Sequence, residues 1–137
     1  MRRLVLARVA LLSAAVLGAA AAARAEPLAG VQIQARAAGG EFRGDTRSMR
    51  GFESHIWRFA PDGSASAIAI ARRSVSNFGS SNTEFGDVGR WRIAGDQLCV
   101  DWAGPNRQFS GCYGVEAQQG NHVRLVGPTR WEGTLER

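Results

Sequence analysis

The most informative stretch of the chain is GRWRIAGDQLCVDW, residues 89–102. Two runs of alternating apolar residues flank a Gly-Asp pair, which suits a two-residue hairpin turn because both central positions of such a turn favour positive φ. The turn predicts three cross-strand pairs: Ile93–Leu98, Trp91–Val100 and Gly89–Trp102. Every apolar side chain of this hairpin then lies on one face, and Cys99 points to the other.

A second turn explains the direction of Cys99. Residues 104–107, GPNR, place Pro and Asn at the two central turn positions, where each is favoured for its backbone geometry. Strands centred on this turn predict the pairs Val100–Gly111, Leu98–Tyr113, Trp102–Phe109 and Cys99–Cys112. Directly opposed residues of antiparallel strands have the Cα separation that a disulfide requires. Apolar alternation and cysteine spacing therefore agree on one register, with a Cys99–Cys112 disulfide across the solvent side.

Further turn signals extend the same pattern in both directions along the chain. The turns at 60–63, 118–120 and 127–129 predict these pairs: Trp57–Ala67, Phe59–Ala65, Val115–Val123, Tyr113–Leu125, Leu125–Trp131 and Val123–Gly133. The expected strands are 28–34, 53–60, 64–72, 86–93, 97–102, 109–117, 121–126 and 130–136. No segment after residue 25 shows helical periodicity, so no helix is expected.

Regularly spaced strands joined by hairpins indicate an all-β, single-domain antiparallel meander. An even number of strands lets the first and the last meet, which predicts an eight-stranded up-and-down, calycin-like barrel with one disulfide. Strands 28–34 and 130–136 would close it. A five-stranded open meander packed on the remaining strands is the alternative architecture.

The first 25 residues have the order of a secretory signal peptide. Basic residues precede the apolar run VALLSAAVLGAAAAA at 9–23, and Ala-Arg-Ala at 23–25 is a small-x-small cleavage site. The run is shorter than the roughly 20 residues that span a bilayer. We therefore expect cleavage after residue 25, a domain at 26–137, a periplasmic or secreted location and no stable membrane insertion. A retained anchor is the alternative.

Processing removes most of the chain's positive charge. All 17 basic residues are arginines, and four of them lie in residues 1–25, so 13 remain against 12 acidic residues, a net charge of +1. No basic field of the kind that binds nucleic acid survives, and no nucleic-acid partner is expected. The two cysteines of an exported chain are expected to form one structural disulfide, with no cofactor.

Two segments, 35–52 and 73–85, are predicted as long loops at one end of the meander, where binding surfaces commonly lie. The candidate binding rim comprises Phe42, Arg43, Arg47, Arg50, Phe78, Phe85 and Arg107. The arginines could hold an anionic ligand or partner, although Glu41, Asp45 and Glu53 are interleaved with them. The phenylalanines either cap the barrel or form an interaction patch.

Aromatic residues dominate the predicted inward face. An eight-stranded barrel is just wide enough to be filled by side chains or to hold one small ligand. The candidate pocket residues are His55, Trp57, Trp91, Trp102 and Trp131. A packed core is favoured over an aromatic pocket, and His55 is interpreted as a core or rim histidine.

No catalytic or metal-binding constellation is evident in the sequence. The two histidines, His55 and His122, are far apart, and the chain has no Ser-His-Asp order, His-Glu-x-x-His helix or Cys/His ligand set. No catalytic residue and no metal ligand are therefore predicted, and the protein is not expected to be an enzyme.

The segments PDGSASA at 61–67, GRWRIAGDQLCVDW and GCYGV at 111–115 resemble a group of small exported proteobacterial proteins of unknown function. The shared pattern is Asp62-Gly63, Gly89, Trp91, Leu98-Cys99, Trp102 and Cys112-Tyr113. The resemblance covers about residues 57–115 and implies an exported β-rich domain without an assigned activity.

We therefore expect a non-enzymatic binding or interaction module that acts through residues 35–52 and 73–85. One version resembles the small barrel inhibitors of bacterial envelopes, which block a hydrolase by inserting loops; its partner would be a periplasmic protein. The alternative is a lipocalin-like carrier of a small apolar ligand.

Overall fold

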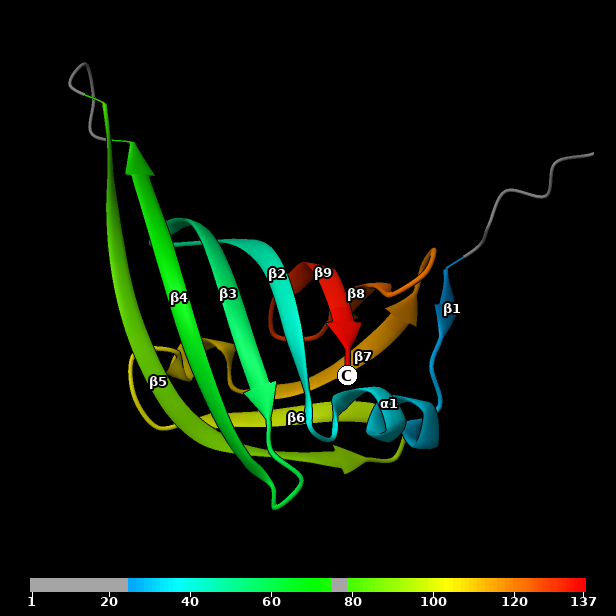
Figure 1. Ribbon diagram of the computed structural model, residues 1–137. Coiled ribbons are helices and arrows are strands. Elements are labelled where there is room, and N and C mark those ends of the chain that lie inside the picture. The colour runs from blue at the N-terminus through cyan, green and yellow to red at the C-terminus, as the bar shows by residue number, and fades with distance from the viewer. Residues whose placement is uncertain (1–24, 75–78) are drawn as a thin grey trace, which may run out of the picture.

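Eight antiparallel strands form a closed barrel in the computed structural model, which describes residues 25–74 and 79–137 (Figure 1). The strands are β2 (Gly40–Ser48), β3 (Gly51–Phe59), β4 (Ser64–Ser74), β5 (Ser80–Ala94), β6 (Gln97–Trp102), β7 (Gly111–Ala117), β8 (His122–Val126) and β9 (Arg130–Glu136). Each strand pairs with its neighbour in the chain, and β9 pairs with β2. The predicted up-and-down barrel is therefore confirmed. Residues 1–24 of the predicted signal peptide lie outside the described residues.

The predicted first strand, 28–34, is wrong, because this segment is mostly helical. A two-residue strand, β1 (Glu26–Pro27), pairs with β7, and the helix α1 (Gly30–Ala37) follows. Gly30, Ile33 and Ala37 are buried on one face of α1. The spacing i, i+3, i+7 defines one face of a helix. The short apolar alternation of this segment is therefore compatible with a strand and with a helix.

Helix α1 packs against β2, β5, β6 and β9 at one end of the barrel. The Gly30 backbone N–H donates to Asp96 Oδ1 at 2.8 Å, in the turn between β5 and β6. A Cβ on Gly30 would lie 2.2 Å from the Gly95 carbonyl oxygen, so only glycine allows the helix to approach this turn. Ile33 is fully buried in the core. The end with the tight turns is therefore covered in part by α1.

The barrel is closed by β2, which lies inside the predicted long loop 35–52. Its inward positions are Phe42, Gly44 and Thr46, of which only Phe42 is a large apolar residue. The Phe42 ring lies over Gly44, where a Cβ would be 2.2 Å from Phe42 Cζ. The inward face of β2 therefore lacks the apolar alternation that identifies a strand, and the loop prediction for 35–52 is wrong.

The predicted loop 73–85 is also wrong, because β4 and β5 continue through most of it. β4 has 11 residues and β5 has 15, and residues 71–74 pair with 80–83. In Figure 1 these two strands project beyond the ends of their neighbours, at the upper left. We call residues 71–74 and 80–85 the β4–β5 arm. Phe78 lies outside the described residues.

The predicted registers of β3 to β7 are confirmed with one exception. The observed pairs include Trp57–Ala67, Phe59–Ala65, Ile93–Leu98, Trp91–Val100, Gly89–Trp102, Leu98–Tyr113 and Val100–Gly111. The predicted Trp102–Phe109 pair does not form, because a short 3-10 helix, η2 (Arg107–Phe109), interrupts the connection. Phe109 is nevertheless buried, and its ring lies 5.0 Å from that of Trp131.

The disulfide between Cys99 and Cys112 is present, with a Cα–Cα distance of 4.0 Å. The two residues are directly opposed on β6 and β7, as predicted. Cys99 shares the outer face of its strand with the exposed Asp101, yet it is only 1% exposed.

The register between β7 and β8 differs from the prediction by two residues. Val115 pairs with Leu125, and Ala117 pairs with Val123. The turn is longer than predicted, because the Gln118 N–H donates to the His122 carbonyl and the His122 N–H to that of Gln119. A shift of two residues keeps each side chain on its face. The inward set is therefore unchanged, and the Leu125–Trp131 and Val123–Gly133 pairs of β8 with β9 are confirmed.

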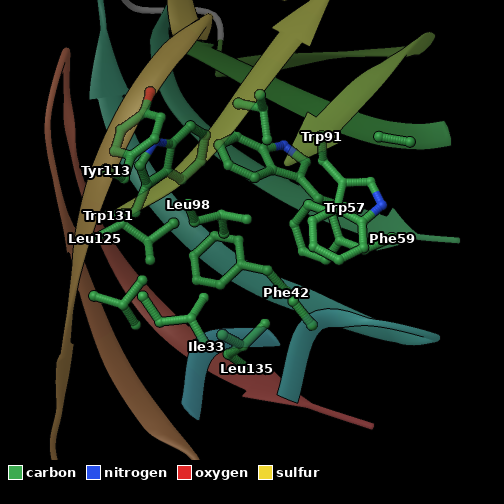
Figure 2. Packing of buried hydrophobic residues seen from close by; sticks show 14 of the residues in the cluster. Ile33, Phe42, Trp57, Phe59, Trp91, Leu98, Tyr113, Leu125, Trp131 and Leu135 are labelled. Carbon is green, nitrogen blue, oxygen red and sulfur yellow. The ribbon is translucent and has the colours of Figure 1, made fainter. Parts of the chain in front are cut away.

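Side chains fill the barrel interior along its length. Figure 2 shows the aromatic rings in one cluster with Ile33 of α1 and Leu135 of β9. Trp57 lies at its centre, with ring centroids 5.4 Å from Phe42, 5.4 Å from Trp102 and 4.9 Å from Trp131. Aromatic pairs at these separations are mutually attractive. The packed core favoured by the sequence is therefore observed.

Candidate functional site

The end of the barrel opposite α1 carries a group of arginines and a buried carboxylate. Four connections lie there: the turn between β2 and β3, the β4–β5 arm, the 103–110 loop between β6 and β7 and the 127–129 turn between β8 and β9. We call this the open end. Side chains along β2 to β5 point alternately to the core and to the solvent. At this end of the barrel, the inward side chains of the arm border the region beside the β2–β3 turn.

Glu53 on β3 is fully buried and accepts hydrogen bonds from three side chains of this end. Its Oε1 accepts hydrogen bonds from Arg50 Nη2 at 2.8 Å and from His55 Nε2 at 3.0 Å. Its Oε2 accepts from Arg50 Nε at 3.2 Å and from the Ser48 hydroxyl. Burial raises the pKa of Glu53, but the bonds from Ser48, His55 and Arg50 outweigh it, and the pKa ends below its ordinary value. Glu53 is therefore an ionised, satisfied carboxylate.

His55 lies beneath Glu53 and is held neutral. The Trp57 indole N–H donates to His55 Nδ1 at 3.1 Å, so that nitrogen carries no proton. His55 Nε2–H then donates to Glu53, which uses both ring nitrogens. Burial lowers the pKa of His55 despite the nearby Glu53 carboxylate. His55 has no free nitrogen for proton transfer, and its role is to connect the Glu53 site to the aromatic core.

Arg50 links the β2–β3 turn to the β4–β5 arm and to the 103–110 loop. Its Nη1 donates to the Pro105 carbonyl at 3.0 Å and its Nη2 to Asn106 Oδ1 at 3.3 Å. Its guanidinium lies 4.5 Å from the ring centroid of Phe85, at the base of the arm. Cation–π contact of this kind adds about 0.5–1 kcal/mol or more when the site is partly desolvated. The Arg50–Glu53 pair therefore connects three of the four connections of this end.

Asp87 organises the loop from 103 to 106. Its Oδ1 accepts from the Gly104 N–H at 2.9 Å, and its Oδ2 accepts from the Asn106 N–H at 2.8 Å. The Arg107 N–H bonds the Gly104 carbonyl, which confirms the predicted turn over Pro105 and Asn106. The buried Asp87 carboxylate therefore fixes the loop whose Pro105 and Asn106 accept hydrogen bonds from Arg50.

Two hollows open at this end and share Arg50 and Arg73. The larger, about 700 Å³, lies beside the β2–β3 turn and is lined by Arg47, Ser48, Met49, Arg50, Gly51, Phe52, Arg72 and Arg73. The smaller, about 350 Å³, lies on the inward side of the arm and is lined by Arg50, Ala71, Arg73, Ser81, Thr83 and Phe85. Among the described residues that line them, none is acidic.

The predicted rim residues lie in different places. Phe42 is fully buried in the core, because it is an inward residue of β2, so its placement on the rim is wrong. Arg43 lies on the outer face in the middle of β2 and pairs with Glu41 there. Phe85 is half-buried under Arg50, and Arg107 is exposed, with Nε donating to the Ala103 carbonyl. Arg47 and Arg50 are therefore the predicted rim residues that line the hollows.

The predicted pocket residues form a packed core. Exposed fractions are 2% for His55, 0% for Trp57 and Trp131, 7% for Trp91 and 4% for Trp102. The Trp91 indole N–H donates to the Ala60 carbonyl at 2.7 Å. These five side chains contact one another or neighbouring core residues and do not border either hollow of the open end.

Sequence reasoning did not single out Arg72, the last residue of the predicted strand 64–72, or Arg73, Ser81 and Thr83, which lie in the predicted loop 73–85. The available signal was the run SASAIAIARRS at 64–74, in which alternation continues to the end and delivers one arginine to each face of β4. Glu53 was treated as an acid that weakens the arginine cluster. The structure places it in the interior, where it pairs with Arg50 alone among the arginines.

In the described part of the chain, no three side chains of metal-binding type are grouped to hold an ion. No helix among residues 25–74 and 79–137 is long and apolar enough to cross a membrane. No family model, no curated protein and no solved structure matches the chain.

Proposed function

We propose that this protein is a non-enzymatic, exported binding module that engages a partner protein through its open end. The observation that carries the proposal is the pair of hollows lined by arginine, methionine, phenylalanine and hydroxyl side chains and anchored on the Arg50–Glu53 pair. Arginine, methionine and aromatic residues are enriched in protein interfaces, whereas aspartate, glutamate and lysine are depleted. The disulfide fits an oxidising compartment, the periplasm or the exterior.

Two exposed apolar side chains strengthen the assignment to a protein partner. Met49 is 98% exposed at the β2–β3 turn, and Phe52 is 41% exposed at the start of β3. Both line the larger hollow beside Arg47 and Arg72. Apolar side chains next to arginines, presented by a rigid barrel, are suitable anchors for an interface. An inhibitor-like mode, in which the β2–β3 turn enters a cleft of the partner, is one form of this function.

The buried state of His55 supports a role without catalysis. Its partner Glu53 is also buried, and the ring nitrogens of His55 are both engaged. The other histidine, His122, is exposed on the outer face of β8, far along the chain from this carboxylate. A general base must reach the proton that it removes, and His55 cannot do so from this position.

Site-directed photocross-linking tests the proposal. A photocross-linking amino acid placed at Met49 should form a discrete adduct in the native compartment, and the adduct should form again when the purified partner is mixed with the purified protein. The matched control is Val31, which is 80% exposed on α1 at the opposite end. Adducts that form equally from both positions, or from neither, would overturn the assignment of function to the open end.

The alternative, a lipocalin-like carrier, shares the eight-stranded barrel. Its ligand would have to displace aromatic side chains from the interior, since Trp57 and Trp131 are fully buried and in contact. Native mass spectrometry of the protein purified from its own compartment distinguishes the two functions. We expect the mass of the polypeptide alone; a retained apolar molecule would favour the carrier.

A further inference from the structure

We propose that the open end recognises an acidic segment of a protein partner, with Arg73, Arg72 and Arg47 binding its carboxylates. This inference rests on the proposed binding function and specifies the chemistry of the partner.

The first argument is the state of the charges. Arg50 is neutralised by Glu53, which is buried beneath it. Among the ion pairs of the described residues, none includes Arg47, Arg72 or Arg73. These three exposed guanidinium groups therefore face hollows whose described lining supplies no carboxylate. Uncompensated positive charge concentrated in a concave surface attracts anions more strongly than the same charge on a flat one.

The second argument is the arrangement of the arm. Arg72 and Arg73 are successive residues of β4, so their side chains leave opposite faces of the ribbon. Arg73 lies directly opposite Ser81, and Ala71 lies opposite Thr83. The smaller hollow thus combines a guanidinium with two hydroxyl groups above the Phe85 ring. Guanidinium groups bind carboxylates through two parallel hydrogen bonds, and hydroxyl groups can satisfy the remaining oxygen lone pairs.

The third argument favours a polypeptide over a small anion. Arg50 and Arg73 border both hollows, so the positive surface continues from the arm to the β2–β3 turn. A single small anion would occupy one hollow only, whereas an extended segment with several carboxylates can occupy both. Met49 and Phe52 line the larger hollow and provide apolar contacts that a bare anion cannot use. The combination fits a segment in which acidic residues accompany an apolar one.

The probe for this inference is a fluorescent oligoglutamate peptide of about eight residues, which spans roughly 26 Å when extended. Binding is measured by fluorescence anisotropy at an ionic strength of about 0.15 M, where exposed charges interact over about 8 Å. We expect the disulfide-bonded protein to bind oligoglutamate and not the matching oligoglutamine peptide. Absence of oligoglutamate binding would overturn the inference.

Two double variants separate a site from general charge attraction. Arg72→Gln with Arg73→Gln removes two exposed arginines from the open end, and Arg90→Gln with Arg92→Gln removes two exposed arginines from the outer face of β5 near the opposite end. We expect the first pair to weaken oligoglutamate binding roughly tenfold or more, because charge-assisted hydrogen bonds are lost. The second pair should change it less than about twofold, as is usual for exposed charges outside a contact. Equal losses in both variants would overturn the inference.

Small anions provide the remaining test. Inorganic phosphate and sulfate should displace the peptide no better than sodium chloride of equal ionic strength. Specific displacement by either ion would assign the hollows to a small anion instead of an acidic polypeptide. Cross-linking from Met49 without oligoglutamate binding would leave the proposed function intact and exclude only the acidic partner, whereas failure of open-end cross-linking would exclude the function itself.

Discussion

His55 Nε2 lies 3.0 Å from Glu53 Oε1, and both side chains are buried two residues apart on the inward face of β3. A histidine and a carboxylate commonly form such a pair at a reactive site. Here the Trp57 indole N–H donates to the other ring nitrogen of His55, and Arg50 and Ser48 donate to the Glu53 carboxylate. The pair joins the aromatic core to the arginines of the open end, and its consequences concern stability and the shape of the proposed binding surface.

We expect the free energy of unfolding to decrease on acidification. Burial lowers the pKa of His55 from its ordinary 6.5, so the unfolded chain binds a proton that the folded protein excludes. Stability is lost as the pH falls below 6.5 towards the folded pKa. The pKa of Glu53 is lowered from 4.5, because its hydrogen bonds outweigh its burial, so its contribution is lost at still lower pH. Urea unfolding at a series of pH values measures both effects.

The matched variant for this pH dependence is His55→Gln, whose side chain does not titrate. It should unfold with a smaller pH dependence immediately below pH 6.5 than the wild-type protein. An identical slope in the two proteins would show that another group causes the loss.

Glu53→Gln should destabilise the protein by about 2–3 kcal/mol, because the amide nitrogen would face donors and Arg50 would lose its buried counter-charge. Its control is Glu132→Gln, since Glu132 is 51% exposed and pairs with Arg124 on the surface. That change should cost less than about 1 kcal/mol. Equal midpoints of urea unfolding for the two variants would contradict the anchoring role of Glu53.

Ile33→Ala should destabilise the protein by about 2–4 kcal/mol, because it leaves a cavity where α1 packs on the barrel. Ile33 is fully buried, whereas Val31 on the same helix is 80% exposed. Val31→Ala should therefore change the stability by less than about 0.5 kcal/mol. Thermal unfolding of both variants checks the prediction, and a small effect at Ile33 would argue against the helix as part of the core.

Loss of the Cys99–Cys112 bond should cost about 3 kcal/mol, as expected for closing a loop between residues 13 apart in the sequence. The double variant Cys99→Ala with Cys112→Ala tests this by urea unfolding. Cys99 is 1% exposed, so the variant also removes packed atoms. The reduced wild-type protein keeps both sulfurs and isolates the contribution of the covalent bond; if reduction leaves the unfolding midpoint unchanged, the bond is not stabilising.

Local signals were sufficient for the central hairpins. Turn residues at 60–63 and 95–96 set the loop lengths, the turn at 104–107 set the register of β6 with β7, and alternation of large apolar residues set the inward face. Opposed cysteines added a separate constraint on β6 and β7. Turn residues and alternation depend on neighbours within a few residues, and the two cysteines lie only 13 residues apart, which is why the registers could be predicted without knowledge of the rest of the molecule.

The candidate site was predicted less well than the fold. The sequence identifies Arg47 and Arg50, but it presents Glu53 only as an acid interleaved with them, and it does not single out Arg72 and Arg73. Glu53 is buried beneath Arg50, whose guanidinium contacts Pro105, Asn106 and Phe85 from distant parts of the chain. Local sequence does not report such burial, because the same residue types also occur on solvated strands.

The amino-acid sequence alone determined the all-β meander, its disulfide and the aromatic composition of its interior, since turn chemistry and two-residue periodicity are local properties. Tertiary structure decided that residues 30–37 form a helix, that residues 40–48 close the barrel, and that Arg50 pairs with a buried Glu53. The outcome depends on which distant surface a segment packs against: Gly30 lies against the β5–β6 turn, and a Cβ on Gly44 would lie 3.0 Å from the Glu132 carbonyl oxygen of β9. Short segments with few large apolar residues fit several local structures, and only the space left by the remainder of the barrel selects one of them.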